Sequence, residues 1–376
     1  MKNRNSFKCC AALAPQFYEF KRFVDVSRNG WARSCSIPVC GGGVSRAQAF
    51  RAFLGEEIER LAMVTAKIHK LRAIKLKEIA YPEQGTFRRV WEPFLSEQRT
   101  SLKALDGEME CVLASELLSQ ATSWVPKELL YFSREGAQRY YPAPDTTGTA
   151  AHFDERLAIR GAFLELVEKS CLAAMWLGRT ARRRFELGGA LSEYKVAYYC
   201  IRAGLRVELF DISFQVPFYV IFSIVDGFEC EPRFGMGCSA STCFEVAVQR
   251  SISEAISLGI AYRGDEWRSS TYRRAATRAP ADVFPYLYEM RATCAGAEKE
   301  RSFRSAAREF MRDAGPIYIY RYTARRPSEW KVVKAVAPGL PFGLVTGWDF
   351  AANRSWLLKM VGRKRILENL APSPFP

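Results

Sequence analysis

The chain has 376 residues, 48% of them hydrophobic and 13% aromatic, so it can bury a large core and supply one large domain or two ordinary ones. Its longest apolar run, residues 216–225, is shorter than the about 20 residues that a membrane span needs. The apolar stretch near the N-terminus is too short for a secretory signal. These features predict a globular, cytoplasmic protein.

Residue usage excludes several kinds of site. The eleven cysteines form no C-x-x-C pair, and their odd number argues against a complete disulfide framework. A histidine-based zinc site or catalytic pair could draw on His69 and His152 alone. The formal charge of +15 suits a nucleotide, an acidic peptide or another polyanion. Its densest cluster, Arg179 to Arg184, is typical of a solvated helix end, a partner surface or a phosphate contact.

Hydrophobic periodicity and end signals predict the first elements along the chain. Residues 1–40 show an irregular pattern, and glycines 41–43 lead into a helix over 45–77. A strand follows over 124–132 and a loop over 140–148. A second helix, capped by Asp154 and running to about Arg184, is apolar at nearly every turn and is expected to be buried.

The second half of the chain alternates helices and strands. Predicted helices span 195–202 and 242–261, and predicted strands span 206–209, 218–225, 316–322 and 331–336. The small residues of 235–241 predict a loop that feeds the second of these helices. A Pro-Gly turn over 338–341 precedes a basic helical segment and a proline-rich end. No repeat of about 20 to 50 residues marks a solenoid, so we expect an α+β fold with mixed sheets and helices.

Three helical segments place carboxylates beside a cation. The sets are Glu56-x-x-Glu59-Arg60, Glu165-x-x-Glu168-Lys169 and Arg250-x-x-x-Glu254. Residues three or four apart share a helix face, which here could hold a magnesium ion and a phosphate together. Solvent-exposed helices also carry such pairs commonly, so each set taken alone is equally typical of a surface.

The surroundings of the three sets differ. The apolar stripe predicted for the first helix consists of Ala47, Phe50, Leu54, Ile58 and Leu61. Glu56 and Arg60 lie opposite that stripe, as a surface pair would. In the second helix, apolar residues surround Glu165 and Glu168, and two buried like charges need a cation, a metal or a proton. The second helix therefore carries the strongest evidence for a site.

The common nucleotide and hydrolase motifs are missing. The sequence has no G-x-x-x-x-G-K-[ST] loop and no G-x-S-x-G elbow, and Gly235-Met236-Gly237 is a fragment of a dinucleotide fingerprint. A P-loop ATPase, a protein kinase and a Rossmann dehydrogenase are therefore not expected. The chain ends in Pro-Ser-Pro-Phe-Pro, a stiff extended tail that could reach into a cleft or be an unimportant terminus.

Taken in order, the motifs resemble the YcaO family from Gly41 to the C-terminus. Residues 47–60 resemble the family's first ExxER helix, and 148–169 resemble its glycine-containing loop and second ExxER helix, followed by Trp176. Residues 237–254 resemble its loop and RxxxE helix, and 336–340 its V-x-P-G-L turn. The resemblance implies a YcaO-type ATP-binding domain without a P-loop over 41–365, after an irregular segment over 1–40 and before a tail over 366–376.

The resemblance also implies ATP and Mg²⁺ as cofactors. The residues that would hold metal ions are Glu56, Glu59, Glu165, Glu168 and Glu254. Those that would bind the nucleotide are Arg60, Lys169, Arg250, Glu56 and Glu165. Lys169 stands where the family has Arg, and Ala52 where many members have Ser. Because lysine keeps the charge but loses the bidentate fork, nucleotide contacts at Lys169 are expected to differ.

A P-x-P-x-P end resembles the members that form azoline rings in ribosomally made peptides. It implies ATP-dependent cyclodehydration of Cys, Ser or Thr to thiazoline or oxazoline through phosphorylation of the backbone amide oxygen, as in a microcin-type synthetase. The tail would reach the active site. There we hypothesise that the carboxylate of Pro376 acts as a base or orienting group, although a free α-carboxyl, with a pKa near ~3.5, is a weak base unless desolvated.

The expected partners are a precursor peptide, a leader-binding ubiquitin-activating-like subunit and an FMN-dependent azoline dehydrogenase, within bacteriocin or antibiotic biosynthesis. Membranes and nucleic acids are not expected partners, and no residue decides whether a homodimer forms. Two alternatives stay open. One is another activity of the family, namely thioamide formation, amidine formation or assistance to thiomethylation. The other is a non-catalytic basic scaffold or RNA-binding protein, which would bind nucleic acid in a salt-sensitive way and turn over no ATP.

Overall fold

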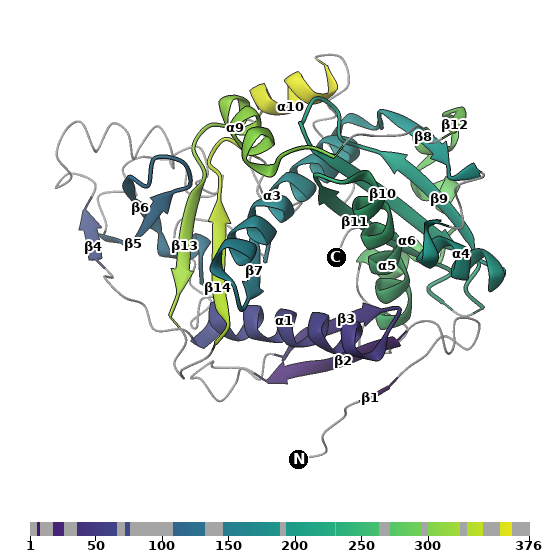
Figure 1. Cartoon of the computed structure of the whole chain (residues 1–376), viewed down its shortest axis with the longest axis horizontal. Helices are drawn as coiled ribbons and strands as arrows, with labels where there is room; N and C mark the ends of the chain where they lie inside the picture. The colour runs from purple at the N-terminus through teal and green to yellow at the C-terminus, as the bar shows by residue number, and fades with distance from the viewer. Residues whose placement is uncertain are drawn as a thin grey trace.

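The computed structural model describes residues 6–7, 18–25, 36–65, 72–75, 108–131, 146–188, 193–229, 231–262, 271–294, 300–323, 329–340 and 354–362. In these ranges the chain forms three β-sheets with helices packed between them (Figure 1). The expected α+β class is therefore confirmed. Within the same ranges, every helix is too short or too polar to cross a membrane.

The smallest sheet comprises β1 (Ser6–Phe7), β2 (Tyr18–Asp25) and β3 (Ser36–Gly43), and α1 (Arg46–Thr65) packs on it. Phe20 of β2 lies with its ring centroid 5.3 Å from that of Phe50 and 6.1 Å from that of Phe53, both on α1. The expectation of irregular structure over 1–40 is therefore wrong for these strands. Aromatic residues that alternate with charged ones over the start of β2 form a half-buried strand, a pattern that the neighbouring cysteines and charges obscure.

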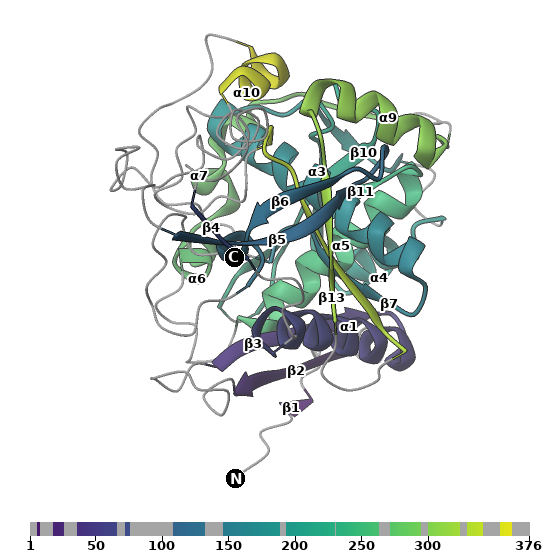
Figure 2. The same cartoon turned by 90° about the vertical axis from the view of Figure 1, so that its left-hand side faces the viewer.

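The six-stranded sheet has the order β4-β5-β13-β14-β7, with β6 paired to β5. Its strands are β4 (Arg72–Lys75), β5 (Glu108–Glu116), β6 (Thr122–Pro126), β7 (Thr149–His152), β13 (Tyr318–Tyr322) and β14 (Lys331–Val336). Figure 2 shows β5, β6 and β13 in front, with α1 below them. The helix predicted to residue 77 ends at Thr65 instead, and β4 occupies part of that range. The strand predicted over 124–132 gives way to a 3-10 turn, Lys127–Leu129.

The five-stranded sheet has the order β11-β10-β9-β8-β12. Its strands are β8 (Arg183–Glu186), β9 (Arg206–Asp211), β10 (Tyr219–Asp226), β11 (Phe234–Ser241) and β12 (Ala292–Cys294). The predicted loop over 235–241 is thus a buried strand, which is a correction. Its small residues are required by packing, because a Cβ on Gly237 would lie 2.0 Å from the carbonyl oxygen of Ser251 on α5.

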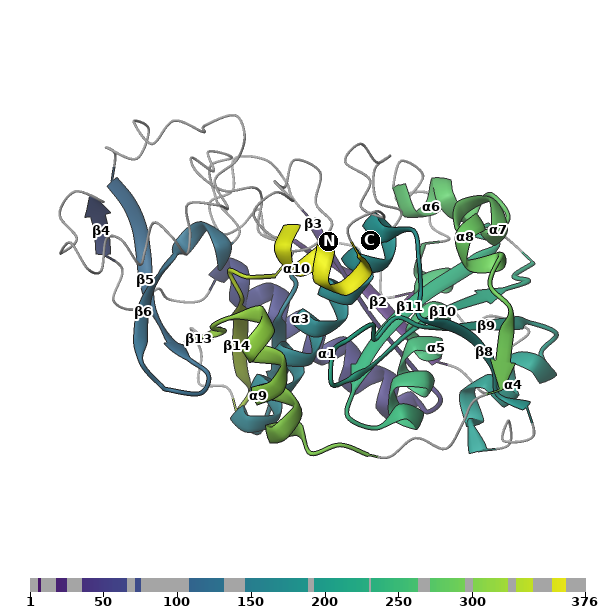
Figure 3. The same ribbon diagram turned by 90° about the horizontal axis from the view of Figure 1, so that it is seen from above.

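The longest helix, α3 (Glu155–Gly178), lies between the two larger sheets. It packs on β14 and β7 on one side and on β11 and β10 on the other (Figure 3). The side chain of Asp154 caps it by accepting a hydrogen bond from the backbone N–H of Arg156, as predicted. The helix ends with Arg179 in the left-handed conformation, φ 46°, so the prediction that it runs to Arg184 is wrong.

The other helices are α4 (Lys195–Arg202), α5 (Phe244–Ala261), α6 (Thr271–Ala276), α7 (Pro280–Val283), α8 (Pro285–Tyr288), α9 (Phe303–Ala314) and α10 (Arg354–Val361). The helices predicted over 195–202 and 242–261 and the strands predicted over 206–209, 218–225, 316–322 and 331–336 are confirmed to within a few residues. α5 packs on β11 and β10 and also contacts β3, so it joins the five-stranded sheet to the smallest one.

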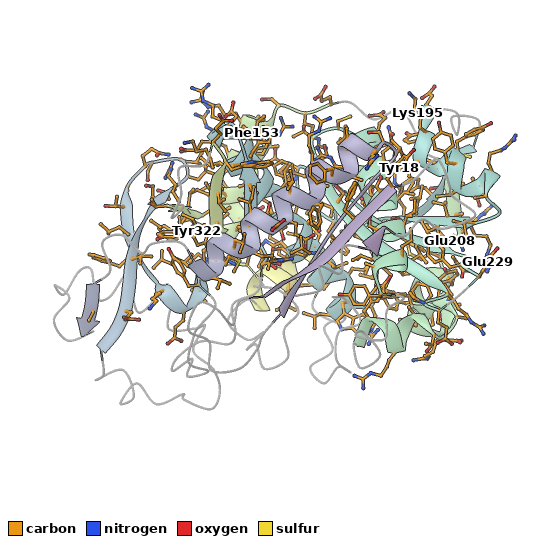
Figure 4. All side chains as sticks on the ribbon, turned by 90° about the horizontal axis from the view of Figure 1, so that it is seen from below. Tyr18, Phe153, Lys195, Glu208, Glu229 and Tyr322 are labelled. Atoms are coloured by element: carbon orange, nitrogen blue, oxygen red, sulfur yellow. The ribbon has the colours of Figure 1, made fainter. Side chains whose placement is uncertain are left out.

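Two ββα units within the chain have the same arrangement of strands and helix. In β2-β3-α1 and in β10-β11-α5, two eight-residue strands pair antiparallel along their whole length and a helix follows after two residues. The two units lie against each other through α5 and β3. Figure 4 shows α1 running between Tyr322 and Phe153 on one side and Lys195, Glu208 and Glu229 on the other. This arrangement brings α1, α3 and α5 to one central region.

Candidate active site

On α1, Glu56 is held by its own ββα unit. Its Oε2 accepts a 2.9 Å hydrogen bond from the backbone N–H of Cys40 on β3, and its Oε1 pairs with Arg60 Nη2 at 2.9 Å. The Glu56 and Arg60 side chains are 24% and 17% exposed, so they are not the surface pair that the predicted stripe indicates. The buried face of α1 instead carries Phe53, and Phe50 is exposed.

Two more carboxylates accept hydrogen bonds from strand backbone. Glu59 Oε1 accepts one of 2.8 Å from the N–H of Ala151 on β7, and Glu254 Oε2 accepts one of 2.8 Å from the N–H of Cys238 on β11. Among the strands that the structure describes, β3, β7 and β11 are each the terminal strand of their sheet. An edge strand has backbone N–H groups that no neighbouring strand uses. Each of the three sheets therefore donates one such group to one carboxylate.

On α3, Glu165 and Glu168 are largely buried between the sheets, in agreement with their apolar surroundings in the sequence. Lys169 Nζ lies 3.4 Å from Glu168 Oε1. Burial raises the pKa of Glu59, Glu165 and Glu168 to about 8 each, with neighbouring carboxylates adding to the effect. Burial also raises the pKa of Glu254. The region thus holds more carboxyl groups than its own cations can keep ionised, so a further cation is needed to ionise all of them at neutral pH.

Two cations lie among these carboxylates. Burial alone would lower the pKa of Arg60 and of Lys169, but the surrounding glutamates offset it and raise both. Arg60 Nη1 is buried and has no hydrogen-bond partner among the residues that the structure describes. A buried guanidinium N–H without a partner is unfavourable, so it points to a ligand with acceptor oxygens.

Lys334 is a residue of the candidate site that the sequence analysis missed. It lies on β14, is fully buried, and its Nζ is 3.4 Å from the hydroxyl of Thr149. Its charge also acts on Glu165, whose pKa it lowers against the effect of burial. The sequence contains one signal for it, a lysine within an apolar strand. If such a strand is buried, the lysine ammonium requires a nearby carboxylate.

The third set lies nearer the surface. Arg250 on α5 is exposed, and both burial of part of its side chain and the charge of Arg160 lower its pKa, whereas Glu168 raises it. The charge of Lys169 lowers the pKa of Glu254, and that of Glu56 raises it. The structure therefore brings together the residues of all three predicted sets. Pro376 and the rest of the tail lie outside the described residues, and Ala52 is exposed.

The arginine cluster after α3 is partly paired within the fold. Arg182 and Arg183 pair with Asp211 at 3.5 and 3.2 Å, and Arg184 pairs with Glu208 at 2.8 Å. The guanidinium carbon of Arg179 lies 3.9 Å from the centre of the Trp176 ring. Two carboxylates thus face three of the four arginines and offset part of the charge on which a nucleic-acid-binding scaffold would depend.

In the part of the chain that the structure describes, no three His, Cys, Asp or Glu side chains form a preformed metal cluster. Magnesium usually takes one or two carboxylates and completes its coordination with phosphate oxygens and water. Acidic side chains that need a cation, next to an arginine that needs acceptor oxygens, fit a magnesium–nucleotide pair better than a metal ion alone.

Carboxylates and cations that converge from three helices, in a chain without a P-loop, suit an enzyme that binds Mg²⁺ and a nucleotide through helix side chains. The chain belongs to the YcaO family, whose model, described as YcaO cyclodehydratase, ATP- and Mg²⁺-binding, matches residues 40–341. The resemblance drawn from motif order is therefore confirmed, as are ATP and Mg²⁺ as cofactors. The domain bounds at 41 and 365 remain predictions. No curated protein matches the chain.

Solved structures share this fold at low sequence identity. A heterocyclase in complex with substrate and cofactor matches 99% of this chain, with a TM-score of 0.73 and 18% identity, and this chain spans 55% of its length. A chain of the E. coli microcin synthetase McbBCD complex with pro-MccB17 bound matches 90% of this chain over 88% of its own, with a TM-score of 0.68 and 16% identity. YcaO from Methanopyrus kandleri, bound with AMPPCP and Mg²⁺, matches 98% over 90%, with a TM-score of 0.61 and 16% identity.

Proposed function

We propose that this chain is the cyclodehydratase component of a multi-subunit synthetase that converts Cys, Ser or Thr residues of a ribosomally made precursor peptide into thiazoline or oxazoline rings. One observation carries the proposal: carboxylates from α1, α3 and α5 converge with the cations Arg60 and Lys169 where three sheet edges meet. The family's cyclodehydratase description, and a heterocyclase and a microcin synthetase among the structural neighbours, support azoline formation over other activities of the family.

The cofactor assignments follow from charge and burial. The residues proposed to hold Mg²⁺ together with phosphate oxygens are Glu56, Glu59, Glu165, Glu168 and Glu254. Arg60 offers its unpartnered Nη1, and Lys169 its ammonium, to the phosphates, while Arg250 lies toward the exposed side. Glu56 and Glu165 border the nucleotide as well, because each lies within electrostatic reach of Arg60.

In the proposed reaction, the thiol or hydroxyl of the substrate loses its proton to a base and forms a bond to the carbonyl carbon of the preceding amide, whose C=O double bond opens to an oxyanion. Mg²⁺-ATP supplies the phosphoryl group that makes the former carbonyl oxygen a leaving group, and ADP departs. The carbon–oxygen bond then breaks, phosphate leaves, the amide nitrogen loses its proton and the ring gains a C=N bond. The chain's own residues hold the phosphates with fixed cations and exclude water, so positioning and charge stabilisation are their main contribution.

The tail and the partners complete the proposal. We propose that the carboxylate of Pro376 accepts or orients the proton that leaves during ring formation. Full activity after removal of residues 373–376 would exclude that role. A leader-binding subunit similar to ubiquitin-activating enzymes and an FMN-dependent azoline dehydrogenase are the proposed partners. The McbBCD complex among the structural neighbours supports a multi-subunit assembly of this kind.

The deciding experiment combines the full chain with the products of neighbouring genes, ATP, Mg²⁺ and a Cys/Ser-rich candidate precursor. ATP hydrolysis and product mass are compared for wild type, Glu168→Gln and Glu309→Gln, an exposed glutamate on α9. We expect wild type and Glu309→Gln to remove the mass of one water per ring, and Glu168→Gln to remove none. A gain equal to the difference between sulfur and oxygen would indicate thioamide formation instead. Unchanged mass without ATP turnover would favour a scaffold.

A further inference from the structure

Arg160, on the second turn of α3, belongs to none of the three acid-and-cation sets. Its Nη2 donates a 3.0 Å hydrogen bond to the hydroxyl of Thr242, and its guanidinium carbon lies 5.1 Å from the centre of the Phe303 ring. Thr242 is buried just before α5, and Phe303 begins α9, so two other parts of the chain restrain this side chain. Holding an arginine in one rotamer costs up to about 2 kcal/mol of side-chain entropy, so the restraint favours a role for the guanidinium.

Arg160 acts on a second guanidinium across the site. Arg250 lies on the second turn of α5, within electrostatic reach of Arg160 and of Glu168. Within the described residues, neither arginine has a carboxylate within ion-pair distance. Two like charges that act on each other are unfavourable unless an anion offsets them. The pair is thus a place for a ligand with several negatively charged oxygens.

The two arginines also have a defined position along their helices. Arg160 lies five residues before Glu165, and Arg250 lies four residues before Glu254. Both guanidiniums are therefore on the N-terminal side of the carboxylates, whereas Lys169 follows its carboxylates on α3. A phosphate chain held through Mg²⁺ at the carboxylates can extend toward this pair. Guanidinium forks match the oxygens of a phosphoryl group.

We infer that Arg160 and Arg250 together bind the terminal phosphoryl group of ATP and retain it as phosphate after transfer. The inference rests on the proposed nucleotide site and adds a residue to it. ADP lacks the phosphoryl group that the two arginines contact. Arg160 would therefore make the site bind ATP more tightly than ADP.

Titration calorimetry of the full chain with Mg²⁺ and either AMPPCP or ADP tests this role. We expect Arg160→Gln to weaken AMPPCP binding about 10- to 100-fold, the range for a lost charge-assisted contact, and to change ADP binding less than about threefold. Arg160→Lys keeps the charge and recovers part of the affinity. Thr242→Val removes the hydroxyl that holds Arg160. We expect it to weaken AMPPCP binding less than Arg160→Gln does, and again to affect AMPPCP more than ADP. Arg308→Gln, an exposed arginine on α9, is the matched control and changes neither affinity.

Equal losses for AMPPCP and ADP would overturn the inference and leave Arg160 with a structural role between α3 and α9. If circular dichroism shows that Arg160→Gln does not fold, the Lys and Val variants decide, and unchanged AMPPCP affinity in both overturns it. Product mass reports on the proposed function separately. If Arg160→Gln weakens AMPPCP binding selectively but the wild type leaves every precursor unmodified, the phosphoryl-binding role of Arg160 is supported and azoline formation is contradicted.

Discussion

Glu254 accepts a 2.8 Å hydrogen bond from the backbone N–H of Cys238, which lies sixteen residues earlier on an edge strand. Glu56 accepts the same kind of bond from Cys40, with the same sequence separation, at 2.9 Å. The two ββα units thus fix one carboxylate each by the same device. A side chain held by its own unit stays in place without a ligand, so these two acids are preorganised for a cation.

This bond separates the structural role of Glu254 from its charge. Glu254→Gln keeps an acceptor for the N–H of Cys238, whereas Glu254→Ala leaves that N–H without a partner, at a cost of about 1–3 kcal/mol. We expect both variants to lose Mg²⁺-dependent ATP turnover at least about 100-fold and the Ala variant alone to unfold at a clearly lower temperature. Thermal unfolding and ATP hydrolysis check this. Full turnover by Glu254→Gln would remove Glu254 from the metal site.

The raised carboxylate pKa values predict how stability depends on pH. Glu165 and Glu168 have a pKa of about 8 in the folded chain, against 4.5 for an ordinary glutamate. A raised pKa in the folded state gives stability that is complete below 4.5 and is lost as pH rises through 8. We therefore expect the melting temperature of ligand-free wild type to fall, relative to that of Glu168→Gln, between about pH 5 and 8.

Mg²⁺ and ATP should reverse that loss. Because the cation favours the ionised carboxylates, binding near pH 7 releases protons, which calorimetry in buffers of different ionisation enthalpy counts. We expect more protons released by wild type than by Glu168→Gln. Equal release by both proteins would show that Glu168 does not change its protonation when the ligands bind.

Lys334 offers a test of the buried charge balance. Lys334→Met removes the cation that acts on Glu165 and leaves that carboxylate less compensated. At pH 6 Glu165 is protonated and the loss is small, whereas at pH 9 an uncompensated buried charge is strongly destabilising, by about 3–5 kcal/mol. Melting temperatures at both pH values check this, with Lys331→Met, an exposed lysine of the same strand, as control. A pH-independent effect would mean that Lys334 acts through packing.

Two glycines distinguish close packing from open space. A Cβ on Gly237 would lie 2.0 Å from the carbonyl oxygen of Ser251 and 2.5 Å from the nitrogen of Ala255, so α5 would have to move off β11. We expect Gly237→Ala to destabilise the chain by at least about 3 kcal/mol in urea unfolding.

On α1, the nearest atom to a Cβ on Gly55 is 4.0 Å away. Gly55→Ala should therefore stabilise the helix by about 0.5–1 kcal/mol.

The sequence identifies the helices and the acidic residues of the site but not the sheet edges that hold them. Glu165 and Glu168 are recognisable because apolar residues surround them on a long helix. The role of Glu56 is hidden, because a helical wheel cannot tell that the face with Phe53 is buried and the face with Phe50 is exposed. Backbone donors such as the N–H of Ala151 carry no side-chain signal, so their position depends on the tertiary fold alone.

The strand β11 shows why local pattern fails at such positions. Gly235 and Gly237 disfavour a strand by propensity, yet they are required because α5 packs on the backbone itself. Lys334 shows the opposite error. Its charge predicts an exposed position, yet it is buried, because Glu165 on α3 compensates its charge. In both cases a long-range contact outweighs local preference.

The three helices that supply the carboxylates begin at residues 46, 155 and 244, so roughly a hundred residues separate each from the next. Contacts between such distant segments form late in folding, because closing long loops is entropically costly. During synthesis, a nascent chain that has not yet reached α5 contains β11 but lacks Glu254, the third helix's carboxylate. Affinity for ATP is therefore acquired when assembly of the molecule is nearly complete, and nucleotide binding can serve as a reporter of finished folding.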